Sequence, residues 1–245
     1  MAAVSSAEEV ERLRAALAEQ QAASRQRQLE RYAADLRETF KEERARAQEL
    51  RDSYFATVRA LTNAVEARDA YTGKHAERVA AYALEIGGAI GERWVGSSEI
   101  EFGFLLHDIG KVAIPDSILH KPEPLTAQER ELIQQHPVIG WEIVRQVDFL
   151  GAASDVVRHH HERWDGDGYP DKLKAEKIPL TARVFAVADT LDALTTTRPY
   201  RPASPIEEAR ILIQEARGTQ FDPAVVDAFM AMPDDVFDGI RAEIG

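Results

Sequence analysis

Phe102-Gly-Phe-Leu-Leu-His107-Asp108-Ile-Gly-Lys111 is an apolar run that ends in an imidazole, a carboxylate and an ammonium group. Adjacent His and Asp side chains cannot share one face of a helix, so a common core role for His107 and Asp108 is disfavoured. At a helix end the pair can hold a divalent metal, His through nitrogen and Asp through oxygen. The alternative is a helix that ends at Gly110 as a C-cap, with His107 and Lys111 complementing its last carbonyls. The rest of the chain decides between these readings.

The composition limits the classes of protein to consider. A chain of 245 residues suits one sizeable domain with an appendage, or two small domains. The absence of cysteine excludes a disulfide scaffold, a Cys-ligated zinc site and thiol catalysis, so His and carboxylates are the strong side-chain ligands that remain. The sequence shows no signal peptide and no run of about 18 apolar residues. We therefore expect a cytoplasmic protein without membrane insertion.

The net charge of −12 is unevenly distributed. Residues 1–60 hold 11 acidic and 11 basic side chains, so the whole acidic excess lies in the remainder. An acidic body argues against binding of long nucleic acid, because that affinity comes largely from Lys and Arg. A small anionic substrate would instead need local metal ions and arginines.

Residues 1–72 contain no Gly and no Pro and are rich in Ala, Glu, Arg, Gln and Leu, which is typical of a long helix. Alternate steps of four and three residues give a mostly apolar seam: Leu29, Ala33, Leu36, Phe40, Glu43, Ala47, Leu50, Tyr54, Thr57, Leu61 and Ala64. Leu13 and Leu17 fall out of this phase, which indicates a stutter or a frayed start. A single exposed helix is the alternative, but the seam favours a parallel coiled coil over residues 1–57 and hence a homodimer.

Residues 58–245 carry repeated helix-start signals and no alternating strand pattern. Ser98 with Glu101 and Thr126 with Glu129 have the spacing of capping boxes. Pro137 fits the first position of another helix. These signals predict an all-α bundle for this second domain.

Six of the seven histidines stand at predicted helix ends or beside turns: His75, His107, His136, His159, His160 and His161. A lone buried His is more often a satisfied core residue than a ligand. The adjacent pairs His160-His161 and His107-Asp108 favour ligands instead. Asp189 follows the apolar stretch 184–188, where a charge is costly to bury unless it is paired or bound to metal.

These ligands are too many for one ion. One site would use His75, His107, Asp108 and Asp189; a second would use His136, His160, His161 and the other oxygen of Asp108. A carboxylate between two ions suggests the two-metal phosphoryl chemistry that clamps attacking and leaving oxygens. A water bridging the ions would lose a proton near neutral pH, so hydrolysis of a phosphate ester by a metal-bridged hydroxide is the expected reaction.

Six ordered motifs closely resemble the HD-GYP domain over about residues 55–232: His107-Asp108, His160-His161-Glu162, Asp165-Gly-Asp-Gly-Tyr-Pro170, Asp189-Thr-Leu-Asp-Ala-Leu194, Arg198-Pro-Tyr-Arg201 and Gly218-Thr-Gln-Phe-Asp-Pro223. The resemblance implies an HD-type helical bundle, here preceded by the coiled-coil helix. It implies hydrolysis of the bacterial messenger cyclic di-GMP to linear pGpG or on to GMP. It also implies two or three metal ions, often iron or manganese, on the seven ligand positions named above.

The same resemblance assigns further roles. Asp108 and Lys111 are implied as catalytic residues, with Lys111 binding a phosphate oxygen or protonating the leaving group; the alternative for Lys111 is an exposed helix-end lysine. Arg198 and Arg201 match the basic pair that holds substrate phosphate, which an arginine fork suits well. Tyr169 is a substrate-binding candidate that stacks on a guanine or helps to dock a partner, or else an aromatic that pins its loop.

One departure from the family pattern is informative. Members with a third metal tend to have Glu four residues before the first ligand His, where this chain has Tyr71. We therefore predict two divalent ions, iron or manganese, with pGpG as the main product. Asp192 is expected to orient a ligand His from outside the site. His159 and His120 are expected to make surface or local hydrogen bonds.

Rival functions remain open at this stage. The chain keeps the ligands and the loop motif that degenerate members of the family usually lose, which favours an active phosphodiesterase. The alternatives are a non-catalytic cyclic di-GMP receptor or scaffold, and a phosphodiesterase for another cyclic nucleotide. The resemblance also admits a diguanylate cyclase (GGDEF-type) partner at the loop around Tyr169, and a receptor docked on the N-terminal helix.

Overall fold

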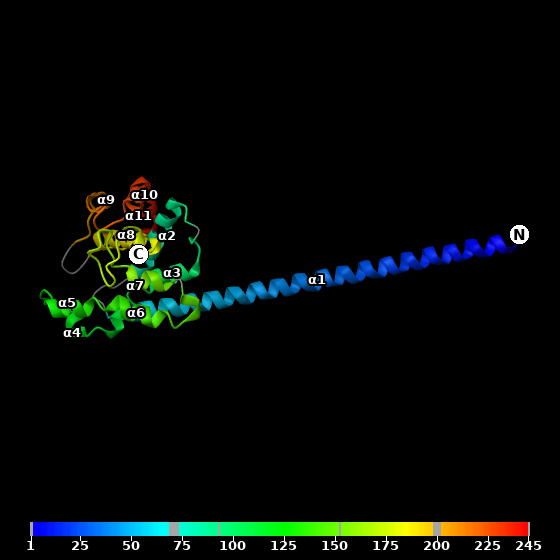
Figure 1. The fold of residues 1–245 in the computed structure, drawn as a ribbon, viewed down its shortest axis with the longest axis horizontal. Helices are drawn as coiled ribbons and strands as arrows, with labels where there is room; N and C mark the ends of the chain where they lie inside the picture. Colours follow the sequence, from blue (N-terminus) through cyan, green and yellow to red (C-terminus); the bar gives the residue numbers. More distant parts are fainter. Residues whose placement is uncertain (1, 69–73, 93, 152, 198–201, 245) are drawn as a thin grey trace. The chain divides into compact units, whose positions relative to one another are not determined.

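The computed structural model describes residues 2–68, 74–92, 94–151, 153–197 and 202–244, with side chains from residue 8 onwards. Within these ranges every regular element is a helix, and the β structure is limited to an isolated bridge between Arg217 and Phe221 (Figure 1). The predicted all-α fold is confirmed. None of the described helices is both long and apolar enough to span a membrane.

The chain divides into two compact units, residues 1–54 and 55–245, and helix α1 (Ala2–Glu66) contributes to both. The predicted long helix is thus confirmed, while the domain boundary after residue 57 stays a prediction. In the first unit the seam residues Leu29, Leu36, Phe40 and Leu50 are 53–67% exposed. A partner helix covering them stays a prediction as well.

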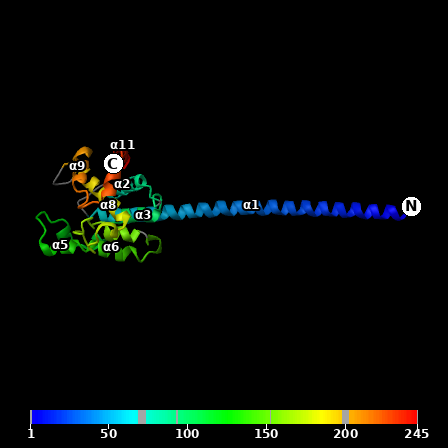
Figure 2. The ribbon, with the colours of Figure 1, turned by 45° about the horizontal axis from the view of Figure 1, so that its top comes forward.

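The second unit is built around α2 (His75–Ile90) and α8 (Leu180–Thr195), which lie side by side in Figures 1 and 2. The other helices described are α3 (Ser98–Leu105), α4 (Asp116–Leu119), α5 (Ala127–Ile133), α6 (His136–Val144), α7 (Ala153–His159), α9 (Ile206–Glu215), α10 (Pro223–Ala231) and α11 (Asp234–Ile244). Short 3-10 helices occur at η1 (Ile109–Ala113), η2 (Asp148–Leu150) and η3 (Ala175–Lys177).

The core lies where α2 and α8 meet α3, α7 and α10. On α2, Val79, Ala83 and Ile86 recur every three or four residues and are fully buried. On α8, Val184 and Phe185 are equally inaccessible, and the Phe185 ring stacks on Phe104 of α3 at 5.6 Å between centroids. This packing fixes the ends of α2 and α3, which carry His75 and lead into His107.

The helix starts test two capping predictions. Thr126 and Glu129 form the predicted reciprocal capping box at the start of α5. The box predicted for Ser98 and Glu101 is wrong. Helix α3 already begins at Ser98 behind Ser97, so Glu101 stands one position too far along the helix to close a box.

Gly110 is required by a close approach of two segments. It lies in η1, and a Cβ added there would overlap the carbonyl oxygen of His136 at the start of α6. The alternative in which Gly110 caps a helix is therefore wrong, because α3 ends at Leu105. Glycine at this point lets the His107-Asp108 turn approach His136.

Candidate metal centre

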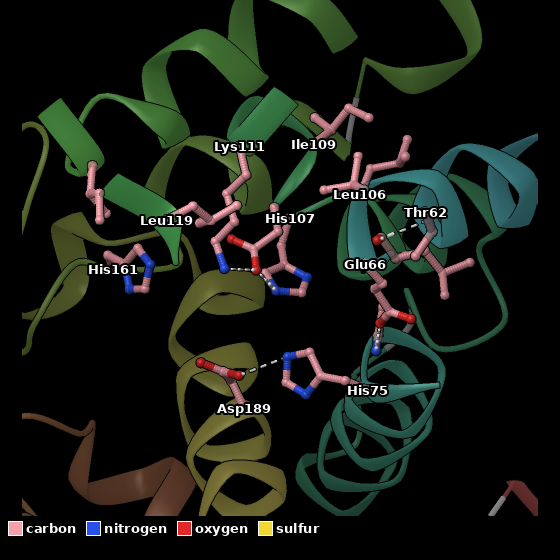
Figure 3. A pocket seen from close by; sticks show the side chains of 15 residues that line it. Thr62, Glu66, His75, Leu106, His107, Ile109, Lys111, Leu119, His161 and Asp189 are labelled. Atoms are coloured by element: carbon pink, nitrogen blue, oxygen red, sulfur yellow. Dashed lines mark hydrogen bonds and ion pairs between the residues drawn. The ribbon is translucent and has the colours of Figure 1, made fainter. Parts of the chain in front are cut away.

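One group of candidate ligands joins three separate segments. His75 is the first residue of α2, His107 follows α3, and Asp189 lies on α8. A ligand atom from each lies within 4.8 Å of the others. Figure 3 shows His75 facing Asp189, with 3.4 Å between Nε2 and Oδ1. Two imidazoles and a carboxylate at this separation can hold a divalent cation.

A second group consists of His136 at the start of α6 and His160 and His161 after α7, again with ligand atoms within 4.8 Å of one another. The Nε2 atoms of His136 and His160 are 3.2 Å apart. Burial and the neighbouring His161 and His136 hold the pKa of His160 well below its usual value. Burial and His136 likewise lower the pKa of His161 to about 3. Both rings are therefore neutral at physiological pH, as metal ligands must be.

Asp108 lies between the two groups. Its Oδ2 is 3.1 Å from Nε2 of His107, and its Oδ1 is 3.3 Å from Nε2 of His136. Burial raises the pKa of this carboxyl, but the Lys111 ammonium and the neighbouring His107 outweigh burial and hold the pKa well below its usual range. The Lys111 ammonium is 2.8 Å from Oδ2. An ionised carboxylate with one oxygen toward each ligand group is suited to bridging two ions.

Three of the candidate ligand histidines share one mode of support. Each donates its Nδ1–H to the backbone carbonyl three residues earlier, which leaves Nε2 as the ligand atom. The pairs are His107 with Phe104 (2.9 Å), His136 with Ile133 (2.7 Å) and His160 with Val157 (2.9 Å).

His75 is supported by a carboxylate instead. Its Nδ1 lies 2.7 Å from Oδ2 of Asp192, a fully buried residue, and Arg78 Nε donates to the other oxygen at 2.6 Å. Asp192 therefore has the orienting position expected from the sequence. Sequence reasoning missed Arg78; the available signal was its position three residues after His75 on the same helix face.

Replacing Arg78 with alanine is expected to destabilise the protein by about 3 kcal/mol, because it removes a partner from a buried carboxylate. For a unit of this size the melting temperature should fall by roughly 10 °C. Thermal denaturation of the wild type and of Arg78→Ala measures this fall in melting temperature. Arg217→Ala is the matched control, since Arg217 pairs with Asp227 at 2.7 Å on the surface and should matter little. An equal loss in both variants would contradict the argument.

The contact between Arg78 and Asp192 also predicts that the stability of metal-free protein depends on pH. Burial raises the pKa of Asp192, but hydrogen bonds from His75 and Arg78 leave it lowered overall. Stability from a carboxylate with a lowered pKa is present above its unfolded pKa and disappears as the pH falls through the folded value. The difference in melting temperature between wild type and Arg78→Ala should therefore become smaller at acid pH, as measured by thermal denaturation across a pH series.

The loop after His161 is tied down at several points. The Glu162 carboxylate accepts backbone N–H groups from Asp171 at 2.8 Å and Leu173 at 3.1 Å. The Tyr169 ring stacks on His161 with 4.7 Å between centroids. A Cβ on Gly168 would overlap backbone next to His161. Tyr169 therefore pins its loop to a candidate ligand, one of the roles considered from the sequence.

A cavity of about 280 Å³ opens beside the first ligand group (Figure 3). Side chains of the candidate centre line one part of it: His75, His107, Asp108, Lys111, His161 and Asp189. Thr62 and Glu66 of α1 line another part. The cavity gives a small anion access to Lys111 and to the candidate ligands.

Some of the remaining predicted positions lie in the described part of the chain and others do not. Arg198, Arg201 and Tyr71 lie outside the described residues. His159 makes the local bonds expected of it, with its ring 3.1 Å from the Asp171 carboxylate and 3.0 Å from the backbone carbonyl of Asp155.

Comparisons with known proteins identify the family of this chain. The sequence profile of a family described as the HD domain matches residues 59–225. The chain is 40% identical over 197 residues to a cyclic di-GMP phosphodiesterase of Thermotoga maritima, covering 80% of this chain and 54% of that protein. It is 39% identical over 198 residues to 3'3'-cGAMP-specific phosphodiesterase 2 of Vibrio cholerae, covering 80% and 38% respectively. The chain thus spans about half or less of the length of these relatives.

A solved structure shows the same fold. It is a cyclic GMP-AMP specific phosphodiesterase of V. cholerae, which superposes with a TM-score of 0.57 at 22% identity and covers 76% of this chain and 50% of its own. At this identity the match establishes the arrangement of helices.

Proposed function

This chain belongs to the HD domain family and to its HD-GYP group, and on that premise we propose that it hydrolyses the phosphodiester bonds of cyclic di-GMP. The observation that carries the proposal is the position of Asp108 between two clusters of candidate ligands. Curated relatives named as phosphodiesterases of cyclic di-GMP and of 3'3'-cGAMP support a cyclic dinucleotide as substrate.

The proposed centre holds two divalent ions, iron or manganese. His75, His107, Asp108 and Asp189 would bind one ion, and His136, His160, His161 and Asp108 the other. The donor set of imidazole nitrogens and carboxylate oxygens fits both metals. Bound there, the ions would supply positive charge for the attacking and leaving oxygens of the phosphodiester.

The chain's own residues would orient the substrate. The Lys111 ammonium lines the cavity and lies where it can bind a phosphate oxygen or donate a proton to the leaving oxygen. Arg198 and Arg201 are proposed to hold substrate phosphate, and Tyr169 to contact the substrate at the edge of the loop that it pins. Tyr71, in place of a further carboxylate, favours two ions and pGpG as the main product.

A product assay tests the proposal. Protein purified without oxygen and supplied with iron(II) or manganese(II) is expected to convert cyclic di-GMP to pGpG, seen by chromatography. Parallel reactions with 3'3'-cGAMP and cyclic AMP test the rival substrate. Binding of cyclic di-GMP without cleavage would support a receptor instead, and neither binding nor cleavage would remove this substrate.

We also propose that two copies of the chain pair through α1. The support is the 3.5-residue apolar seam, whose members Leu29, Leu36 and Phe40 are largely exposed in one chain. Light scattering at micromolar concentration should give a dimer; a monomer would contradict the pairing. The proposal includes a GGDEF-type or receptor partner. It also includes a cytoplasmic location, because a bacterial messenger is consumed there.

A further inference from the structure

We propose that Thr62 and Glu66 of α1, with Arg68 two residues after its end, position the candidate metal centre through hydrogen bonds with three segments that carry its residues. All three belong to the compact unit of residues 55–245. Their bonds to these segments go to backbone groups and not to the candidate ligand atoms, so they are positioning residues. The inference rests on the proposed function of the same site.

Glu66 caps the helix that begins with His75. The first N–H groups of a helix lack intrahelical partners, and the N-cap residue Lys74 makes no side-chain capping bond. The carboxylate of Glu66, the last residue of α1, accepts the backbone N–H of Ala76 at 2.8 Å (Figure 3). A negative charge at this position also complements the helix dipole. Glu66 thereby fixes the end of α2 at which the first candidate ligand stands.

Arg68 holds the segment that carries Lys111. Its guanidinium donates to the backbone carbonyls of Val112 at 2.7 Å and Ile114 at 3.0 Å, and it pairs with Asp116 at 2.7 Å. The short helix η1 leaves such carbonyls without helical partners, and a planar fork of donors can satisfy several at once. Arg68 therefore fixes the backbone from which Lys111 reaches Asp108.

Thr62 reaches the third segment. Its side chain is buried and donates to the carbonyl of Leu105, the last residue of α3, at 3.1 Å. Leu105 stands two residues before His107. Thr62 and Glu66 are four residues apart, so they share one face of α1, and both line the cavity. One helix face thus forms a wall of the cavity and also holds the backbone on either side of it.

The first test measures manganese(II) affinity by competition with a chelator in the full-length chain. Glu66→Ala should weaken binding roughly tenfold, at the lower end of the effects seen for outer-shell partners of metal ligands. Glu66→Gln keeps an oxygen that can accept the Ala76 N–H and should restore affinity to within about threefold. Arg46→Ala is the control, since Arg46 pairs with Glu43 at 3.4 Å on the exposed surface of the same helix and should leave affinity unchanged.

Unchanged affinity in Glu66→Ala, or an equal loss in Arg46→Ala, would overturn the role of Glu66. This measurement needs no substrate. If the wild-type chain binds manganese but does not cut cyclic di-GMP, the proposed function fails while the positioning role is still decided.

The second test separates Arg68 from its ion pair. Arg68→Ala should speed hydrogen exchange at the Ile114 amide, which bonds to the Lys111 carbonyl, and lower kcat/KM about tenfold with manganese affinity retained. Asp116→Ala removes the ion pair but leaves the carbonyl acceptors, so both quantities should stay near wild type. If Asp116→Ala reproduces the effects of Arg68→Ala, or if Arg68→Ala changes neither quantity, Arg68 has no positioning role.

Discussion

Replacing Asp108 with alanine is expected to lower the rate of cyclic di-GMP hydrolysis by on the order of a thousandfold or more, because both proposed ions lose a shared ligand. Asp108 is the described carboxylate with one oxygen near each ligand group, at 3.1 Å from His107 and 3.3 Å from His136. The loss should appear in kcat at saturating substrate, measured by chromatography of pGpG.

Asp155→Ala is the matched control for this change. Asp155 is an exposed carboxylate on α7, the helix that leads into His160, and its removal should leave the rate near that of the wild type. Circular dichroism and the melting temperature establish that each variant is folded. If folded Asp108→Ala kept more than about a tenth of the activity, the bridging role would be wrong.

The sequence allowed prediction of those parts of the site that depend on neighbours along the chain. The long α1 followed from a stretch without Gly or Pro, and the capping box of Thr126 and Glu129 from a spacing of three residues. The structure brings six of the seven predicted ligands together in two groups, and Asp108 lies between them. Four of the seven stood out because they form the adjacent pairs His107-Asp108 and His160-His161.

The supporting contacts could not be predicted in this way. Arg68 bonds to the carbonyl of Val112, 44 residues later, and Arg78 bonds to Asp192, 114 residues later. No local period relates such pairs, because the fold alone brings them together. Backbone carbonyls are also present at every residue, so the sequence cannot show which of them a given arginine will reach. The capping box predicted at Ser98 failed for a local reason. The spacing of Ser98 and Glu101 fits a capping box, but Ser97 is the N-cap residue of α3, so the helix starts one residue too early for that box.

Removing one histidine from the second ligand group should change the number of bound ions. We expect the wild-type chain to bind two manganese ions and the His160→Ala variant about one. His160 belongs to the group with His136 and His161, so its removal leaves the first group of ligands intact. Hydrolysis should fall on the order of a hundredfold, since one of two ions that stabilise charge is lost. Metal analysis after removal of weakly bound ions, with kcat on the same samples, measures both effects.

His159→Ala is the matched control for this prediction, because His159 is the preceding residue and contacts Asp171 rather than a candidate ligand. It should retain two ions and full activity. If His160→Ala lost both ions, the two groups would be a single interdependent site, as expected if Asp108 cannot hold the first ion alone with His75, His107 and Asp189. Three tightly bound ions in the wild type would instead contradict the role assigned to Tyr71, and complete hydrolysis to GMP would then be expected. Metal analysis together with product chromatography therefore tests both the number of bound ions and whether hydrolysis stops at pGpG.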